Sequence, residues 1–121
     1  MKILTIGDVV GEAGLDALHA LLRRIKRDTG ADFVIVNGEN AAGNGVLPRQ
    51  AEDIFDAGAD VVTLGNHAFG KQQIVPYLDE HSDILRPANL APQSPGQGWG
   101  IFDGPQGSRL LVIDLDRKSV V

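Results

Sequence analysis

The feature that most constrains this chain is a set of three short apolar runs, each followed at once by glycine and polar residues. The runs are Ile3–Ile6, Phe33–Val36 and Val61–Leu64. They are rich in β-branched residues and lack helical spacing, so they predict buried β-strands. Segments with helical spacing lie between them, and this alternation of strands and helices predicts a parallel sheet covered by helices.

Three helices are expected between and after these strands. Leucines and an isoleucine recur at helical spacing from Leu15 to Ile25, with basic residues on the other face, and Gly30 is suited to end that helix. Pro48 suits the first turn of a second helix, which would end at Gly58. A third helix is predicted from about Lys71 to Glu80.

The C-terminal part of the chain predicts further strands but no second domain. Ile84–Arg86 predicts a short fourth strand, and the segment Pro87–Gly98 is a connector rich in proline and glycine. Ile101–Phe102 and Leu110–Leu115 flank a Gly-Pro turn and predict a hairpin. We therefore expect residues 1–121 to form a single α/β domain.

Charge and composition exclude several functional classes. The formal net charge is −5, with 11 basic and 16 acidic residues, which argues against a dedicated nucleic-acid coat or a binder of anionic membranes. The chain has no cysteine, which excludes disulfides and thiolate metal sites and is compatible with a reducing cytoplasm. Asp8 comes too early for a secretory signal, and no apolar run approaches membrane-spanning length. We therefore expect a cytoplasmic protein with no membrane partner.

Polar donors follow all three predicted strands. The carboxyl ends of parallel strands form one edge of a sheet, so these donors can converge there. A dinuclear metal site for phosphoester hydrolysis needs oxygen and nitrogen ligands from several strands and one position open to water. His67 could instead face the substrate and protonate the leaving oxygen. The residues with donors suited to the metal ions are Asp8, Glu39, Asn40 and Asn66.

Each of these residues also has an ordinary structural explanation. Asp8 could cap a loop, the asparagines could serve turn geometry, and His67 could be a neutral hydrogen-bonded histidine. Arg86 is expected near the same sheet edge, where it could hold a phosphate or form a structural salt bridge. The glycines at the start of the chain do not match the spacing of a dinucleotide-binding loop, which leaves a nucleotide-dependent oxidoreductase as a distant alternative.

Four segments together resemble the YmdB-like branch of the calcineurin-like metallophosphoesterases: Ile6–Gly11, Val36–Gly43, Leu64–His67 and Leu85–Asn89. The resemblance extends from Lys2 to about Asp116. It implies an αββα sandwich, of which this chain would form mainly the first parallel-sheet half with its covering helices. It also implies a phosphodiesterase with two divalent metal ions (Mn, Fe, Zn or Mg) and small phosphodiester substrates such as 2′,3′-cyclic nucleotides.

The resemblance assigns roles to the same residues. Asp8 would bind one metal ion, Glu39 would bridge both, and Asn40 and Asn66 would bind the second ion or its shell. His67 would act as the acid or hold the phosphate.

The chain also departs from the family pattern, since members are considerably longer and supply further metal-binding histidines from their second half. We therefore expect a truncated domain that is inactive or weakly active alone. The alternative is a non-catalytic nucleotide- or anion-binding module with a regulatory role. The apolar strand Leu110–Leu115 would expose one face in such a fragment, so a homo-oligomer is expected.

Overall fold

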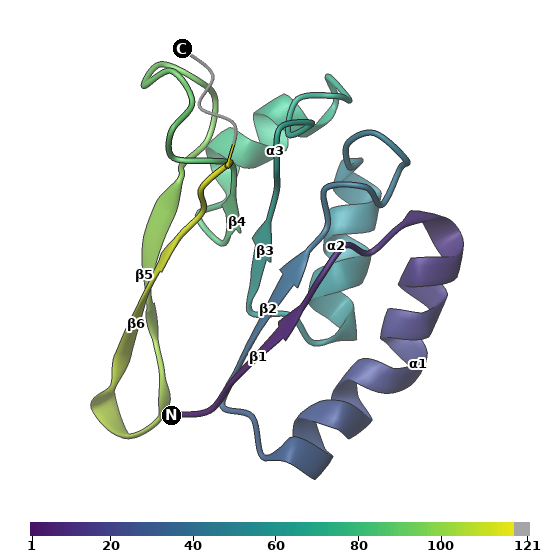
Figure 1. Ribbon diagram of the computed structural model, residues 1–121, viewed down its shortest axis with the longest axis vertical. Coiled ribbons are helices and arrows are strands. Elements are labelled where there is room, and N and C mark those ends of the chain that lie inside the picture. The colour runs from purple at the N-terminus through teal and green to yellow at the C-terminus, as the bar shows by residue number, and fades with distance from the viewer. Residues whose placement is uncertain (118–121) are drawn as a thin grey trace.

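A four-stranded parallel sheet forms the centre of the fold in the computed structural model, which describes residues 1–117. The strands lie in the order β1 (Ile3–Ile6), β2 (Phe33–Asn37), β3 (Val61–Thr63) and β4 (Ile84–Leu85). Each strand pairs in parallel with the next strand along the chain. The predicted parallel α/β sheet is therefore confirmed, and its short strands run upwards in Figure 1.

Three helices cover one face of this sheet (Figure 1). They are α1 (Gly11–Thr29), α2 (Pro48–Ala57) and α3 (Ile74–Glu80). Successive side chains of a strand point to opposite faces, so alternate residues of β2 and β3 contact the helices. Val34, Val36 and Val62 are fully buried in the core that these strands form with α1 and α2.

The ends of the helices follow the sequence signals closely. Gly30 ends α1 in the left-handed conformation, with φ of 70°, and Pro48 occupies the first turn of α2. Helix α3 begins at Ile74 rather than near Lys71, because residues 66–73 form turns. His81 ends α3, and its Nδ1 atom lies 2.8 Å from the carbonyl oxygen of Tyr77.

A hairpin covers the other face of the sheet. It consists of β5 (Trp99–Asp103) and β6 (Arg109–Ile113), which are antiparallel and joined through a short 3₁₀ helix (Pro105–Gly107). Its inward side chains Phe102, Leu110 and Val112 pack against a second cluster formed by Phe33, Val61 and Leu85. The predicted hairpin is confirmed, with β5 longer than expected and β6 ending at Ile113 instead of Leu115.

Arg86 has a role that neither of the two sequence interpretations anticipated. The side chain is buried, and its guanidinium group donates hydrogen bonds to the carbonyl oxygens of Pro87, Ser94 and Pro95. It therefore ties down the connector between β4 and β5 rather than forming a salt bridge or facing a phosphate.

In the part of the chain that the structure describes, no helix has the length and apolar character needed to cross a membrane.

Candidate functional site

The carboxyl ends of β1, β2 and β3 meet at one edge of the sheet, at the top of Figure 1. Backbone hydrogen bonds hold the loops that follow these strands against one another. The Val9 N–H donates to the Asn37 carbonyl at 3.1 Å, and the Gly38 N–H donates to the Thr63 carbonyl at 3.0 Å. The edge is therefore a continuous surface built from three loops, as the parallel topology requires.

Asp8 and Asn40 form the first contact between predicted site residues. The Asn40 amide nitrogen Nδ2 donates a hydrogen bond of 2.8 Å to Asp8 Oδ1. Asp8 has a positive φ of 41°, in a region that few residues other than glycine adopt. The carboxylate of the first loop and the amide of the second are thereby held side by side.

Glu39 and His67 form the second contact. Glu39 Oε2 accepts a hydrogen bond of 2.7 Å from the backbone N–H of His67 and lies 3.2 Å from its ring Nδ1. The Glu39 side chain is 13% exposed, whereas that of His67 is 48% exposed. A carboxylate beside Nδ1 orients the imidazole, so Nε2 is the ring nitrogen left to meet a ligand.

The turn between β3 and His67 approaches Glu39 so closely that a side chain at position 65 would displace the Glu39 carboxylate. A Cβ atom at Gly65 would lie 2.6 Å from Glu39 Cδ and would also overlap both carboxylate oxygens. Asn66 follows in the same turn with an exposed side chain that makes no hydrogen bond to the described residues. The structure thus pairs four of the predicted residues and places the fifth next to them in the chain.

The donor chemistry suits hard divalent cations, but the number of strong ligands is small. Carboxylate and amide oxygens with one imidazole match what Mg²⁺, Mn²⁺, Fe²⁺ or Zn²⁺ accept. Among residues 1–117, however, no three His, Cys, Asp or Glu side chains are grouped so that they could hold a metal ion. The described residues therefore have donor atoms of the type that a divalent ion accepts, but they are too few to fill its coordination shell.

Asp114 is a buried acid beneath the site that sequence reasoning missed. It follows β6, and its Oδ2 accepts a hydrogen bond of 3.0 Å from the Leu64 backbone N–H at the end of β3. Burial is the main reason that the pKa of Asp114 is raised to about 7. The negative charges of Glu39 and Asp116 also raise this pKa, whereas the Leu64 hydrogen bond lowers it.

The sequence pattern around Asp114 does not show by itself that this residue is buried. It shares the two-residue period of Leu110 and Val112, which face the sheet, but the neighbouring positions 111, 113 and 115 are equally apolar. Because both faces of this strand are apolar, periodicity did not distinguish the buried face from the exposed one.

Gln50 is a second buried polar residue that shapes the site. Its Oε1 accepts a hydrogen bond of 2.9 Å from the Leu47 N–H, and its Nε2 donates to the Ala41 carbonyl at 3.2 Å. Gln50 therefore joins the start of α2 to the loop that carries Glu39 and Asn40.

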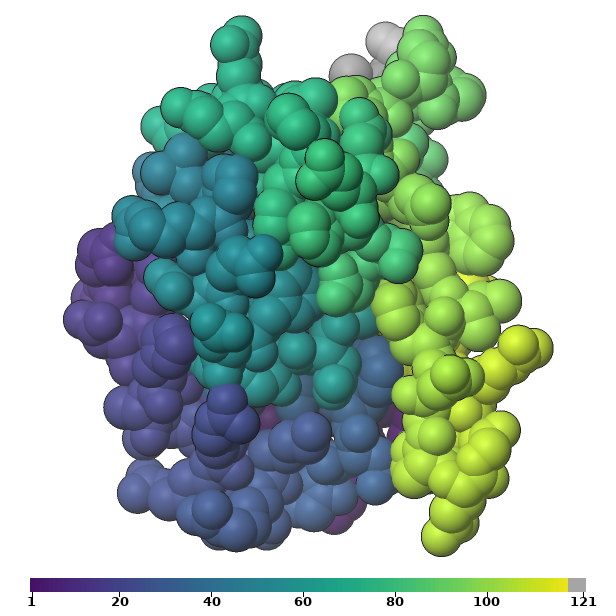
Figure 2. All heavy atoms as spheres, turned by 180° about the vertical axis from the view of Figure 1, so that it is seen from behind, coloured from purple at the N-terminus to yellow at the C-terminus, as the bar shows by residue number. Residues whose placement is uncertain are grey.

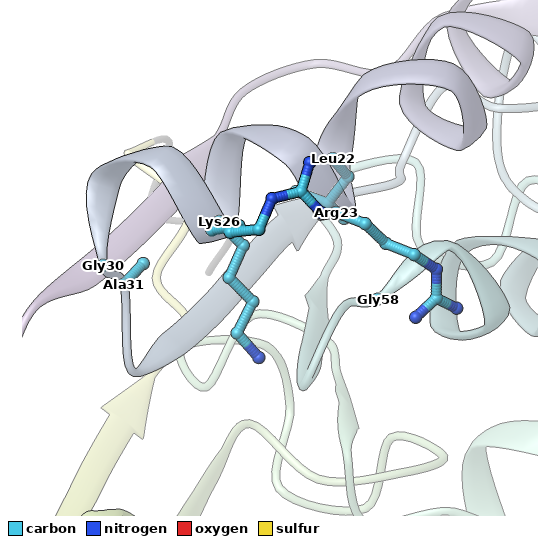
Figure 3. Close-up of a pocket in the computed structure, with 7 residues that line it drawn as sticks. Leu22, Arg23, Lys26, Gly30, Ala31 and Gly58 are labelled. Atoms are coloured by element: carbon cyan, nitrogen blue, oxygen red, sulfur yellow. The ribbon is translucent and has the colours of Figure 1, made fainter.

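A separate pocket of about 450 Å³ lies at the C-terminal end of α1, at the opposite end of the sheet from this site. Its lining includes Arg23, Lys26 and Gly58 (Figure 3). The Arg23 guanidinium donates a hydrogen bond to the Asp56 carbonyl. The Lys26 amine points away from the Arg23 guanidinium. The pocket therefore shares no residue with the site at the strand ends.

Comparisons of the sequence identify the family. The chain matches the family described as YmdB-like protein over residues 4–121. It is 37% identical over 120 residues to the 2′,3′-cyclic-nucleotide 2′-phosphodiesterase of Bacillus subtilis (strain 168). This alignment covers 98% of the present chain and 45% of the relative, so the chain spans less than half the length of that protein.

Solved structures agree with this result. A hypothetical protein from Thermus thermophilus superposes with a TM-score of 0.86 and 37% identity, over 95% of this chain and 44% of the other. A phosphatase from Mycoplasma pneumoniae superposes with a TM-score of 0.88 and 28% identity, over 100% of this chain and 44% of the other. These similarities confirm a metallophosphoesterase-like α/β fold, of which the chain forms the part with the parallel sheet. The chain belongs to the YmdB-like protein family.

Proposed function

We propose that this chain carries part of a metal-dependent phosphodiesterase site for phosphodiesters such as 2′,3′-cyclic nucleotides. The observation that supports it most is the pairing of Asp8 with Asn40 and of Glu39 with His67 at one sheet edge. Membership of the YmdB-like family and the activity named for the Bacillus subtilis relative give the reaction class. We propose further that residues 1–121 belong to one domain and have little or no activity alone.

The proposed ligands of two divalent ions are Asp8, Glu39, Asn40 and Asn66. Glu39 would help to hold the ions, because it follows β2, which lies between β1 and β3, and its side chain is mostly buried. The left-handed backbone of Asp8 supports a functional role, since such conformations are concentrated at active sites. When bound, the ions would polarise the phosphate and make a water molecule more acidic.

His67 is the proposed general acid. In phosphodiester hydrolysis a water oxygen forms a bond to phosphorus while the bond to the leaving oxygen breaks, and that oxygen needs a proton. Glu39 holds the Nδ1 side of the ring, so the proton would come from Nε2. The half-exposed position of His67 leaves this nitrogen within reach of a substrate in solvent.

The expected low activity follows from the ligand shortage in residues 1–117. Each ion would complete its shell largely with water and would therefore bind weakly. Titration of the chain with Mn²⁺, followed by electron paramagnetic resonance, measures the binding directly. Glu39→Gln is expected to lower the Mn²⁺ affinity by at least about tenfold, or about 1.4 kcal/mol, whereas Asp16→Asn on the exposed surface of α1 should leave it unchanged.

The same preparations test activity on bis(4-nitrophenyl) phosphate and on 2′,3′-cyclic AMP with added Mn²⁺. We expect little or no turnover by the chain alone. Robust turnover by the purified chain would refute the proposed inactivity, and an unchanged Mn²⁺ affinity in Glu39→Gln would refute the ligand assignment.

A second candidate function is a non-catalytic nucleotide- or anion-binding module with a regulatory role. The shortage of metal ligands among the described residues favours it. Calorimetric binding of 2′,3′-cyclic AMP separates the two functions. Binding that persists in excess EDTA supports the module, and binding that requires a divalent ion supports the phosphodiesterase site.

A further inference from the structure

The pocket of about 450 Å³ described above lies where the C-terminal ends of α1 and α2 meet. Its volume is in the range of pockets that hold small molecules. Figure 2 shows α1 and α2 next to each other on one side of the molecule and the hairpin on the other side. A Cβ atom at Gly58 would lie 3.7 Å from Leu22 Cδ2, so the end of α2 packs directly on α1. Both walls of the pocket are therefore formed by described residues.

The wall that α1 contributes carries three cations. Arg23, Lys26 and Arg27 all line the pocket. Residues three and four positions apart lie on the same face of a helix, so these side chains belong to one group. Like charges at this spacing repel each other, and an anion placed between them would relieve the repulsion.

No acidic side chain offsets these three charges in the part of the chain that the structure describes. The ion pairs of residues 1–117 involve Arg49 and His67 instead. Arg23 donates a hydrogen bond to the uncharged carbonyl group of Asp56, and the side chains of Lys26 and Arg27 have no partner among the described residues. The pocket therefore presents cations that are available to a ligand.

The helix dipole accounts for only part of this group. Cations in the last turn of a helix are stabilised by its C-terminal end, which explains Lys26 and Arg27, but Arg23 lies before the last turn. The last carbonyl groups of α1 also have donors of their own. The Gly30 N–H donates to the Arg27 carbonyl at 3.3 Å, and the Ala31 N–H donates to the Lys26 carbonyl at 3.1 Å. The basic side chains are therefore not needed to satisfy these carbonyl groups.

We propose that this pocket binds a small phosphate-bearing molecule of about the size of a mononucleotide. The guanidinium groups of Arg23 and Arg27 can each donate two parallel hydrogen bonds to phosphate oxygens, and Lys26 adds a third positive charge. Leu22 and Ala31 provide an apolar floor for the rest of the ligand. The pocket lies at the opposite end of the sheet from the strand-end site, so the inference does not depend on the proposed function.

The charge of the whole chain favours a small anion over a nucleic acid. The formal net charge is −5, and a long polyanion would be repelled by the acidic surface beyond the pocket. A ligand that carries its charge in one phosphate group meets only the cations of α1. The concave shape of the site also suits a compact ligand better than an extended strand.

Nuclear magnetic resonance with adenosine 5′-monophosphate as the probe tests the proposal on the intact chain. Excess EDTA removes divalent ions, so that the strand-end site cannot recruit the nucleotide through a metal. We expect millimolar nucleotide to shift the backbone amide signals of Gly30, Ala31 and Gly58, and to leave those of Gly38 and Gly65 at the strand ends in place. Inorganic phosphate should shift the same signals only at higher concentration, and adenosine should not shift them.

Variants on α1 test which charges bind the phosphate. Lys26→Gln and Arg27→Gln should each lower the affinity for the nucleotide by at least about tenfold, because each removes a charged hydrogen bond. Arg24→Gln is the matched control, since it removes the same charge from α1 at a position that does not line the pocket. This control should change the affinity by less than about twofold, because salt screens an exposed charge outside the pocket. Circular dichroism verifies that all three variants fold.

Several results would overturn this assignment. An absence of shifts at Gly30, Ala31 and Gly58, or shifts confined to the strand-end glycines, would show that the pocket does not bind the nucleotide. Equal losses of affinity in Arg24→Gln and Lys26→Gln would mean that the overall charge of α1 acts and not the pocket. Equal affinities for inorganic phosphate and the nucleotide would refute the predicted ligand size, and equal binding of adenosine would refute phosphate recognition.

Discussion

Replacement of Asp114 by asparagine is expected to stabilise the protein at neutral and alkaline pH. The folded protein raises the pKa of this carboxyl group from 3.8 to about 7, chiefly because burial disfavours its charge. Asparagine has nearly the same shape and retains an oxygen that can accept the Leu64 N–H, but it carries no charge. The variant therefore removes the pH-dependent cost of ionising Asp114 and keeps the contact.

The sign and size of the effect follow from linkage. A group whose folded pKa lies above its unfolded pKa contributes most to stability below the unfolded value, and this contribution is lost as the pH rises through the folded value. The parent should therefore lose stability between about pH 4 and pH 8. At about 1.36 kcal/mol for each pH unit, the change from 3.8 to about 7 corresponds to about 4 kcal/mol.

Urea unfolding at a series of pH values and at fixed protein concentration measures this effect. Other groups titrate equally in both proteins, so the quantity of interest is the difference in unfolding free energy between Asp114→Asn and the parent. That difference should grow by about 4 kcal/mol from pH 4 to pH 8 in favour of the variant. Asp16→Asn, at an exposed position of α1, is the control and should show a nearly constant difference.

A difference between Asp114→Asn and the parent that stays constant over this pH range would refute the reasoning. It would mean that the carboxyl group titrates as it does in the unfolded chain, and hence that water or a cation reaches it. A difference that grows in favour of the parent would mean that the ionised carboxylate stabilises the fold.

Two further predictions concern close packing and a buried cation. Gly65→Ala should lower the unfolding free energy by about 1–3 kcal/mol, because the added Cβ atom overlaps the Glu39 carboxylate. Gly7→Ala is the control and should change the unfolding free energy by less than about 0.5 kcal/mol, because no atom lies within 4 Å of its added Cβ. Equal unfolding free energies of the two variants in urea would contradict the overlap. Arg86→Met should cost about 3 kcal/mol, because it leaves the buried carbonyls of the connector without their donor. Limited proteolysis should then cut the connector at residues 87–98, and a resistant connector would argue against this role.

The Asp8–Asn40 and Glu39–His67 contacts at the strand ends differ in how firmly their side chains are held. Asp8 and Asn40 are exposed or half-buried, so their hydrogen bond exchanges readily with water or a cation. Glu39 is held by the backbone of His67 and by the space that Gly65 leaves, which makes it the more rigid member of the set. The structure therefore combines one firmly held carboxylate with a more adaptable carboxylate–amide pair at the same edge of the sheet.

Much of the fold could be predicted because its signals are local. Strand β2 and its neighbours are uninterrupted β-branched runs, and helices α1 and α2 carry their own periodicity and their own glycine or proline ends. The parallel order follows from the alternation of strands and helices. The parallel strand order was sufficient to predict that Asp8, Glu39 and His67 lie at one edge of the sheet, because each residue follows the end of its strand.

The amino-acid sequence by itself determined the elements, their parallel order and the polar residues at the strand ends, because these depend on neighbours in the chain. Only the tertiary structure decided which of those residues touch. Glu39 meets His67 across 28 residues, and Asp114 meets Leu64 across 50. The tertiary structure also decided that Arg86 holds a connector and that, within residues 1–117, the outward apolar side chains of the hairpin are exposed. Contacts of this kind depend on how distant segments pack, and composition and periodicity carry no record of that geometry.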